Sequence, residues 1–351
     1  MWNQNKVVFK LKSPLHIGYT PFKSSVVSPT RYYILGRNFW GAITKRITEF
    51  SSSSPKSKDY IEIGRDVRKN FIFSYFYLYH GNTVYYPNYK ENKLKYGDMD
   101  VSDFESRFIG SRISTAIDNS GTAKDESLHE IEYINNKFKD NNGNVNDVKI
   151  AGCIWIKENA TIKDKKLEIT NDGIYINNFN IIKELILGGE SKYGFGHVEF
   201  YSFDDKVNFP EIITDIKENA NELSGKIQEN KPILSHLEYS KEIPFKGEIE
   251  LLSGRAYYDI QKESNNNEAK DSKPGNSFLE TKYYFSPGTV ILKDDMDVSL
   301  QWDGKLKLIH NKWNLSTYNK CKTLGDRQNS YKSHNIYKIN VRSLFYVNLI
   351  N

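Results

Sequence analysis

The sequence predicts an α+β fold: a ferredoxin-like βαββαβ domain with insertions, RRM-like in its sheet, followed by a second strand-rich ferredoxin-like unit. Three observations predict it. An alternating strand at 7–17 is followed by a helical spacing at 38–50. A second helical spacing at 179–187 leads into a glycine-rich loop and another alternating strand at 197–203. Strand-like patterns then dominate the last third of the chain.

The first strand and helix rest on the spacing of apolar residues. Val7, Phe9 and Leu11 alternate with polar side chains, which predicts a half-buried strand. Phe39, Ile43, Ile47 and Phe50 recur at helical spacing, with Asn38 as the expected N-cap and the serines before Pro55 as the end.

The middle of the chain is less regular. Residues 71–79 are aromatic and fit either a strand or a buried helix. An Asn-rich stretch containing Asn142-Gly143 predicts the tip of a long hairpin at about 129–156, with arms at 129–134 and 148–156. The helix at 179–187 and the strand at 197–203 complete the first domain, residues 1–205.

Residues 206–240 are polar and are expected to connect the two units. The second domain, residues 241–351, is predicted to be strand-rich. Its expected strands lie at 247–252, 283–293, 306–310 and 336–348.

Composition and charge limit the classes of function. A formal net charge of +5 and an isoelectric point near 8.7 favour an anionic partner without identifying one. The two cysteines, Cys153 and Cys321, are far apart, which argues against a disulfide framework or a zinc site. No apolar run is long enough to span a membrane, and we expect a cytoplasmic protein with no membrane partner.

The most informative segment is the glycine-rich loop at 188–196. Its glycines permit backbone with positive φ and a close approach to a polyanion, while lysine adds charge and the aromatic rings offer stacking faces. The loop matches neither a P-loop nor a dinucleotide fingerprint. From these residues alone, a glycine-rich turn from helix to strand is favoured over a binding site. The alternative is a site for the phosphates of RNA, formed by Gly188, Gly189, Ser191, Lys192, Tyr193, Gly194, Phe195 and Gly196.

Three segments in this order resemble the RAMP superfamily, the RNA-binding subunits of CRISPR effector complexes. They are Ser13-Pro14-Leu15-His16-Ile17-Gly18 after the first strand, residues 33–43 at the entry to the first helix, and the loop at 188–196. Residues 112–132 are similar to the segment that leads into that family's thumb hairpin. The resemblance covers roughly residues 7–203.

The resemblance implies a subunit that binds CRISPR guide RNA next to target RNA, further RAMP subunits and the large signalling subunit. Residues 284–290, with Pro287-Gly288-Thr289-Val290, look like a strand start in the type III subunits that hold the 5′ handle of the guide. We therefore favour a handle-capping subunit of a type III complex, with type III-D as a candidate subtype, acting in antiviral defence.

The main rival interpretation within the family is a backbone subunit that cleaves target RNA. In those subunits, an aspartate in the loop after the first strand supports metal-dependent cleavage. Residues 18–30 contain no carboxylate here, and Ser or Lys cannot replace an aspartate as a ligand for Mg²⁺. We therefore expect no catalytic residue, no metal and no cofactor.

Three less favoured hypotheses complete the range of functions. A guide-processing ribonuclease would use a histidine such as His16 or His197 as a general acid or base, although a structural role is favoured for both. Asp98, Asp100 and Asp103 are expected to form a solvated acidic loop rather than a calcium site. A ferredoxin-like assembly protein that binds no RNA represents a different class of function.

Basic residues outside the loop complete the expected RNA surface. Phosphate contacts accumulate without sequence specificity, so a group of cations matters more than any one of them. The expected residues are His16, Lys23, Arg31, Arg37, Lys45, Arg46, Arg107 and Arg112. The protein would hold the guide's shape, while base pairing with the target reads its sequence.

Overall fold

The protein is described by a computed structural model of the 351-residue chain. The described residues are 1–19, 26–90, 93–123, 127–219, 222–252, 255–256, 277–278, 282–293 and 296–309. They form a mixed α+β structure that is rich in strands, with three α-helices. The strand predicted at 336–348, Lys23 and Cys321 lie outside them.

An eight-stranded sheet organises the first half of the chain, and its main path runs in the order β19-β20-β1-β14-β5-β3. Strand β4 also pairs with β14, and β6 pairs with β5. All its pairings are antiparallel. Its strands are β1 (Trp2–Leu11), β3 (Tyr33–Ile34), β4 (Phe71–Phe73), β5 (Phe76–His80), β6 (Thr83–Tyr85), β14 (Lys149–Lys157), β19 (Glu184–Ile186) and β20 (His197–Phe203).

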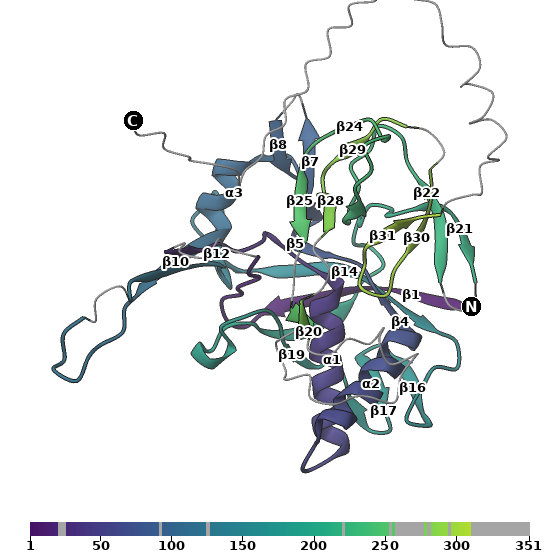
Figure 1. The fold of residues 1–351 in the computed structure, drawn as a ribbon, viewed down its shortest axis with the longest axis horizontal. Helices are drawn as coiled ribbons and strands as arrows, with labels where there is room; N and C mark the ends of the chain where they lie inside the picture. The colour runs from purple at the N-terminus through teal and green to yellow at the C-terminus, as the bar shows by residue number, and fades with distance from the viewer. Residues whose placement is uncertain are drawn as a thin grey trace, which may run out of the picture.

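Strand β1 is half-buried, as predicted: one face is buried at Val7, Phe9 and Leu11, whereas on the other face Lys10 is only half-buried and Gln4 is exposed. Val8 is the exception, because it is buried on the second face. Val7, Val8, Phe9 and Leu11 are all inaccessible to solvent. Figure 1 shows α1 and α2 on one side of this sheet and the second large sheet on the other.

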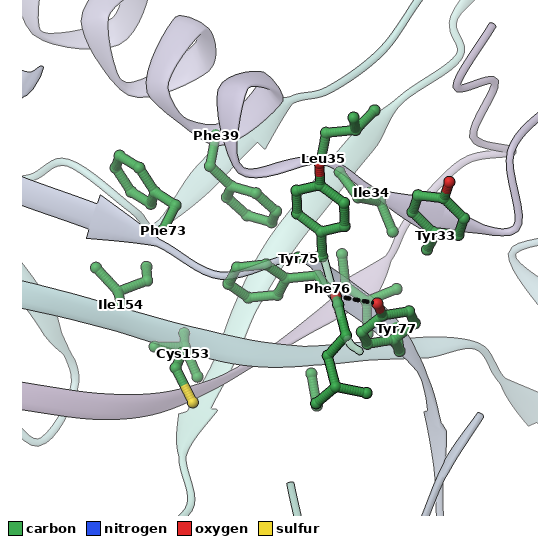
Figure 2. Packing of buried hydrophobic residues seen from close by; sticks show 14 of the residues in the cluster. Tyr33, Ile34, Leu35, Phe39, Phe73, Tyr75, Phe76, Tyr77, Cys153 and Ile154 are labelled. Atoms are coloured by element: carbon green, nitrogen blue, oxygen red, sulfur yellow. Dashed lines mark hydrogen bonds between the residues drawn. The ribbon is translucent and has the colours of Figure 1, made fainter. Parts of the chain in front are cut away.

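Helix α1 (Gly36–Ser51) confirms the predicted first helix but begins earlier, at an N-cap on Leu35 rather than Asn38. Phe39, Ile43 and Ile47 are buried as expected. Phe39 stacks on Phe76 of the sheet with 3.9 Å between ring centroids, and Figure 2 shows the two rings facing each other beneath the helix. This aromatic contact fixes α1 on the sheet.

Two further helices, α2 (Ser57–Asn70) and α3 (Val101–Phe108), were not predicted. Helix α2 packs beside α1 and is mostly polar. The aromatic stretch at 71–79 forms strands β4 and β5, so it belongs to the sheet and is not a buried helix.

The second predicted helix is absent. Residues 179–187 form β18 (Phe179–Asn180) and β19 instead. Strand β18 closes a four-stranded sheet with β15 (Thr161–Ile162), β16 (Lys165–Thr170) and β17 (Gly173–Ile176). The apolar residues have helical spacing, but the stretch is short and its backbone is used in strand pairing, as in the bond from Ile181 N–H to the Ile174 carbonyl.

The predicted arms of the 129–156 hairpin do not pair with each other. Strand β11 (His129–Ile134) pairs with β10 (Ile109–Ser114) and with β2 (Val27–Ser28), whereas β14 lies in the main sheet. The turn at Asn142-Gly143 was predicted correctly, but it joins two short strands, β12 (Lys137–Lys139) and β13 (Val145–Asp147). Figure 1 shows the β10–β11 hairpin projecting from the body of the protein.

The second half contains a seven-stranded sheet in the order β21-β22-β30-β31-β23-β28-β25. The segment expected to be a connector supplies three of its strands, so 206–240 is not a linker. The strands are β21 (Thr214–Glu218), β22 (Leu223–Ile227), β23 (Leu237–Glu238), β25 (Ile249–Leu252), β28 (Lys282–Phe285), β30 (Met296–Leu300) and β31 (Leu306–Leu308).

Smaller sheets complete the structure. Strands β7 (Pro87–Lys90), β8 (Lys93–Tyr96) and β9 (Met99–Asp100) form one, and the pairs β24–β29 and β26–β27 form two more. The bounds of the pairs are Phe245–Lys246, Val290–Ile291, Arg255–Ala256 and Ser277–Phe278. One continuous apolar core joins both large sheets. None of the described helices has the length and apolar character needed to cross a membrane.

Candidate nucleic-acid interface

The glycine-rich loop connects β19 to β20 and folds back on itself. Ser191–Tyr193 form a single turn of 3-10 helix, η1. The flanking Glu190 and Gly194 have φ angles of 57° and 83°, in the left-handed region. Strand β20 follows the loop at the position that the sequence predicted.

The loop packs directly on the segment that follows β1. Gly189 N–H donates to the His16 carbonyl at 2.9 Å, and Gly196 N–H donates to the Pro14 carbonyl at 2.7 Å. A Cβ on Gly188 would lie 2.2 Å from the His16 carbonyl oxygen, and one on Gly196 would lie 2.0 Å from the Leu187 carbonyl oxygen. These glycines are therefore required by close backbone contacts within the protein.

The same hydrogen bonds restrict the expectation that backbone N–H groups of this loop bind phosphates, because five of these groups already have partners. Besides Gly189 and Gly196, the N–H groups of Tyr193, Gly194 and Phe195 donate to carbonyl oxygens of the loop itself. A donor that is already satisfied cannot also cradle an anion without losing its bond. These five N–H groups therefore do not bind an external anion, and any contact with a polyanion falls to the other N–H groups and to the side chains of the loop.

Lys192 and Tyr193 are the side chains that the loop offers for this. Both are exposed, and the Tyr193 side chain is 68% exposed. Phe195 points the other way: it is buried, with its ring edge against Tyr133 of β11 at 5.3 Å between centroids. The loop thus presents one cation and one aromatic ring to solvent, a combination suited to a phosphate and a base.

The β10–β11 hairpin starts beside this loop. Leu15 forms a β-bridge with Ile134, and His16 Nδ1 lies 2.7 Å from the Glu132 carbonyl oxygen. Three of the four segments that resemble the RAMP superfamily (13–18, 112–132 and 188–196) therefore meet at one place.

Among the described residues of the hairpin, one Arg or Lys side chain and several apolar side chains are exposed. The cation is Arg112, and the apolar side chains are those of Ile113, Ile117 and Leu128. Ile117 is 71% exposed, although large apolar side chains usually pack against the rest of a protein. These apolar residues were not identified from the sequence, because no pattern there distinguishes them from core residues.

The turn beyond Ile117 is held by Asp118, which accepts hydrogen bonds from the hydroxyl groups of Ser120 and Thr122. These bonds lower the pKa of Asp118 to about 2. The turn is therefore stabilised by its own polar residues.

Two of the predicted basic residues, His16 and Arg31, are buried, and Arg37 is half-buried at the start of α1. Neither buried side chain can lie on an RNA surface, so the prediction that they bind RNA was wrong. Of the four basic residues predicted at or near the first helix, Arg31, Arg37, Lys45 and Arg46, only Lys45 is fully exposed.

The two remaining basic residues of the first helix have partners within the chain. The Arg46 guanidinium lies over the Phe179 ring at 4.9 Å, and burial lowers its pKa. Lys45 is exposed and forms an ion pair with Glu49 at 3.7 Å on the same helix.

Arg31 belongs to a buried polar cluster between the two large sheets. Its Nη1 atom lies 2.6 Å from Glu250 Oε2 and 3.0 Å from the Tyr33 hydroxyl. Glu250 also contacts His236 Nε2, and His236 Nδ1 lies 2.6 Å from the Tyr75 hydroxyl. Burial lowers the pKa of His236, although Glu250 opposes the shift.

Burial alone would raise the pKa of Glu250, but His236 and Arg31 outweigh it and hold that pKa well below its usual range. Arg31 therefore stabilises the junction of the sheets and is not exposed to a ligand. This junction cluster, Arg31, Tyr33, Tyr75, His236 and Glu250, brings together residues more than 200 positions apart, which no local pattern in the sequence could reveal.

Two more segments singled out in the sequence, residues 284–290 and the acidic residues at 98–103, pack or form ion pairs within the protein. Residues Pro287 to Val290 are buried, and Gly288 N–H donates to the Ile233 carbonyl, so this segment packs rather than faces solvent. Asp98 pairs with Lys90, and Asp100 pairs with Lys95 at 3.3 Å. Within the described parts of the chain, no group of three or more His, Cys, Asp or Glu could hold a metal ion.

No family model matches the sequence, and no curated protein matches it. Solved structures with a similar arrangement include a type III-B Cmr-beta complex bound to cognate target RNA, with a TM-score of 0.43 and 14% identity over 82% of this chain and 86% of the other. The same complex with AMPPnP gives the same TM-score and identity over 82% and 85%. Its apo state gives a TM-score of 0.31 and 10% identity over 58% and 98%. These TM-scores are too low to carry a functional argument.

Proposed function

We propose that this chain is an RNA-binding subunit of a type III CRISPR effector complex, where it holds the 5′ handle and the phosphate backbone of the guide RNA. The observation that carries the proposal is the convergence of three sequence segments. The residue 13–18 segment, the glycine-rich loop and the β10–β11 hairpin are far apart in the sequence, yet hydrogen bonds and ring contacts join them. A surface built from these segments is what the RAMP resemblance implies.

The strand order supports a ferredoxin-like first domain. Strands β20, β1, β14 and β4/β5 lie side by side and antiparallel, and α1 lies between β1 and β4 in the chain. The place of the second helix in such a unit is taken by the four-stranded sheet β15–β18. The described residues of the second half contain strands and no helix, so a ferredoxin-like second unit has no such support.

The RNA would be held by side chains at the loop and along the hairpin. Lys192 and Arg112 would neutralise phosphates, and Tyr193 would stack on a base. The exposed apolar residues of the hairpin, such as Ile117, would be covered by a neighbouring subunit or by the guide–target duplex. Holding rather than cleaving is proposed because residues 18–30 supply no carboxylate.

Binding of labelled single-stranded RNA, measured by fluorescence anisotropy at several salt concentrations, tests the proposal. Tyr193→Ala should weaken binding by about 1–3 kcal/mol, the value of one base–aromatic stack, with little change in salt dependence. Lys192→Ala should reduce the slope of log affinity against log salt by about 0.7.

Tyr193→Phe and Lys192→Arg are the matched controls: the first keeps the aromatic ring, and the second keeps the positive charge. Both should bind like the wild-type chain. If Tyr193→Ala and Lys192→Ala also bind like the wild-type chain, the loop is not an RNA-binding surface. If the unmodified chain shows no salt-dependent RNA affinity, an assembly protein that binds no RNA is favoured instead.

A further inference from the structure

A second cationic site, separate from the glycine-rich loop, lies between α3 and the turn that joins β12 to β13. A surface cavity of about 790 Å³ is lined there by Arg107, Lys137 and Lys139, with Asp103 as the carboxylate. Met99 and Val145 add apolar atoms to its wall. The volume is within the usual range for sites that take a nucleotide-sized ligand.

The cations of this cavity differ from neighbouring lysines in forming no close ion pair with a carboxylate. Lys10 pairs with Asp147 at 2.6 Å, Lys95 pairs with Asp100 at 3.3 Å, and Lys90 pairs with Asp98. Among the described residues, no carboxylate lies within ion-pair distance of Arg107, Lys137 or Lys139. Their charge is therefore available to an anion from outside the chain.

The acidic groups nearby are already engaged. Asp147, which lies opposite Lys137 in the strand pair, is bound by Lys10. Asp140 accepts hydrogen bonds from the N–H groups of Asn142 and Asn144 in its own turn, and these bonds lower its pKa. Asp103 remains as one negative charge against three positive charges in the lining.

Packing holds the two walls of the cavity in place. Phe138 is buried, with its ring 4.9 Å from the Phe108 ring of α3 and 4.8 Å from the His80 ring of β5. Arg107 Nη2 donates to Asn141 Oδ1, which joins the helix to the turn. A guanidinium fixed by a neutral amide keeps its charge and several donors for a second partner.

We propose that this cavity binds a phosphate-bearing nucleotide ligand, with Arg107, Lys137 and Lys139 on the phosphate and Met99 and Val145 beside the sugar or base. The phosphate belongs either to the backbone of an RNA strand or to a free nucleotide. With an RNA strand as the ligand, the site rests on the proposed function and adds a second binding surface to it; with a free nucleotide, it goes beyond that function. It is built from elements outside the glycine-rich loop and needs neither Lys192 nor Tyr193.

The test compares Lys137→Ala/Lys139→Ala with Lys58→Ala/Lys165→Ala in the full chain. Each double variant removes two exposed lysines, so the change in net charge is the same. Binding of labelled single-stranded RNA is measured against salt, and binding of AMP is measured by titration calorimetry. If RNA is the ligand, the cavity variant should bind several-fold more weakly, with a salt slope reduced by up to about 1.4.

The two sources of phosphate give different results. Loss of RNA affinity without any AMP binding to the wild-type chain identifies a strand backbone as the ligand. Saturable AMP binding that disappears in the cavity variant identifies a free nucleotide. If both double variants bind RNA and AMP alike, the proposal is overturned. Because the Lys192 and Tyr193 variants report on the loop separately, either site can fail while the other stands.

Discussion

Two groups of cations in this protein have opposite surroundings. At the junction cluster, the Arg31 side chain is 7% exposed and is matched by Glu250, with tyrosine hydroxyls and His236 completing the cluster. At the glycine-rich loop and the α3 cavity, Lys192, Lys137 and Lys139 are exposed. The first group can act only on the fold, because its charge is already neutralised and removed from solvent.

The contrast shows why basic residues cannot be assigned to a nucleic-acid surface by type or by proximity in the sequence. Arg31 lies just before the first helix and Arg37 in its first turn, which made both of them candidates for RNA binding. Burial and pairing decide the role. An exposed cation with no acidic partner can neutralise a phosphate, whereas a buried, paired one cannot do so without leaving a carboxylate uncompensated.

The largest effect on the fold should come from Glu250→Gln. The change leaves the Arg31 guanidinium buried without its anion, and breaking one partner of a buried pair costs about 3 kcal/mol or more. Chemical denaturation measures the loss. Glu62→Gln is the control, because the Glu62 side chain is 42% exposed and its pairs with Lys58 and Lys163 are worth about 1 kcal/mol or less. Equal losses in both variants would mean that the junction is not a buried ion pair.

A smaller effect, confined to the loop, should distinguish Gly196 from Gly194. Gly194→Ala places a side chain at φ 83° with nothing within 4 Å, so it should cost only about 1–2 kcal/mol of left-handed strain. Gly196→Ala adds a contact of 2.0 Å with the Leu187 carbonyl oxygen and should cost clearly more. Denaturation midpoints measure both. If the two alanines cost the same, the loop does not pack on the backbone as described.

The pH dependence of stability tests whether His236 is buried in its neutral form. Its pKa is lowered in the folded state, so below about pH 6.5 the unfolded chain binds more protons and the free energy of unfolding falls. Glu250, whose pKa is also lowered, adds to this loss below about pH 4.3. His236→Gln should flatten the curve between about pH 7 and 5. A slope unaffected by His236→Gln would show that His236 does not titrate on unfolding.

The sequence predicted the parts of the fold that depend on local pattern. The first strand and helix, the glycine-rich loop and the strand after it all have periodicity or turn residues that act over a few positions. The prediction of a helix at 179–187 was wrong because the backbone of these residues pairs with other strands. Such long-range pairing overrides the local spacing of the apolar residues. The prediction of a hairpin at 129–156 was wrong for a related reason, since β14 pairs with β1 and not with β11.

The candidate site was predictable only in part. Lys192 and Tyr193 stand out in the loop because of their neighbours, and both are exposed. Whether Lys137 forms an ion pair depends on which carboxylates lie near it. Whether Arg31 is buried depends on which sheets pack around it. Those neighbours come from distant parts of the chain, as Glu250 does for Arg31. A linear sequence does not reveal them.

The most direct test of the proposed function is to purify the tagged chain from its native host and identify what accompanies it. The co-purified RNA would be sequenced, and the co-purified proteins would be identified by mass spectrometry. We predict guide RNAs that share one repeat-derived 5′ end, together with further subunits of a type III effector complex. Recovery of the chain with neither such RNAs nor such subunits would contradict the proposal.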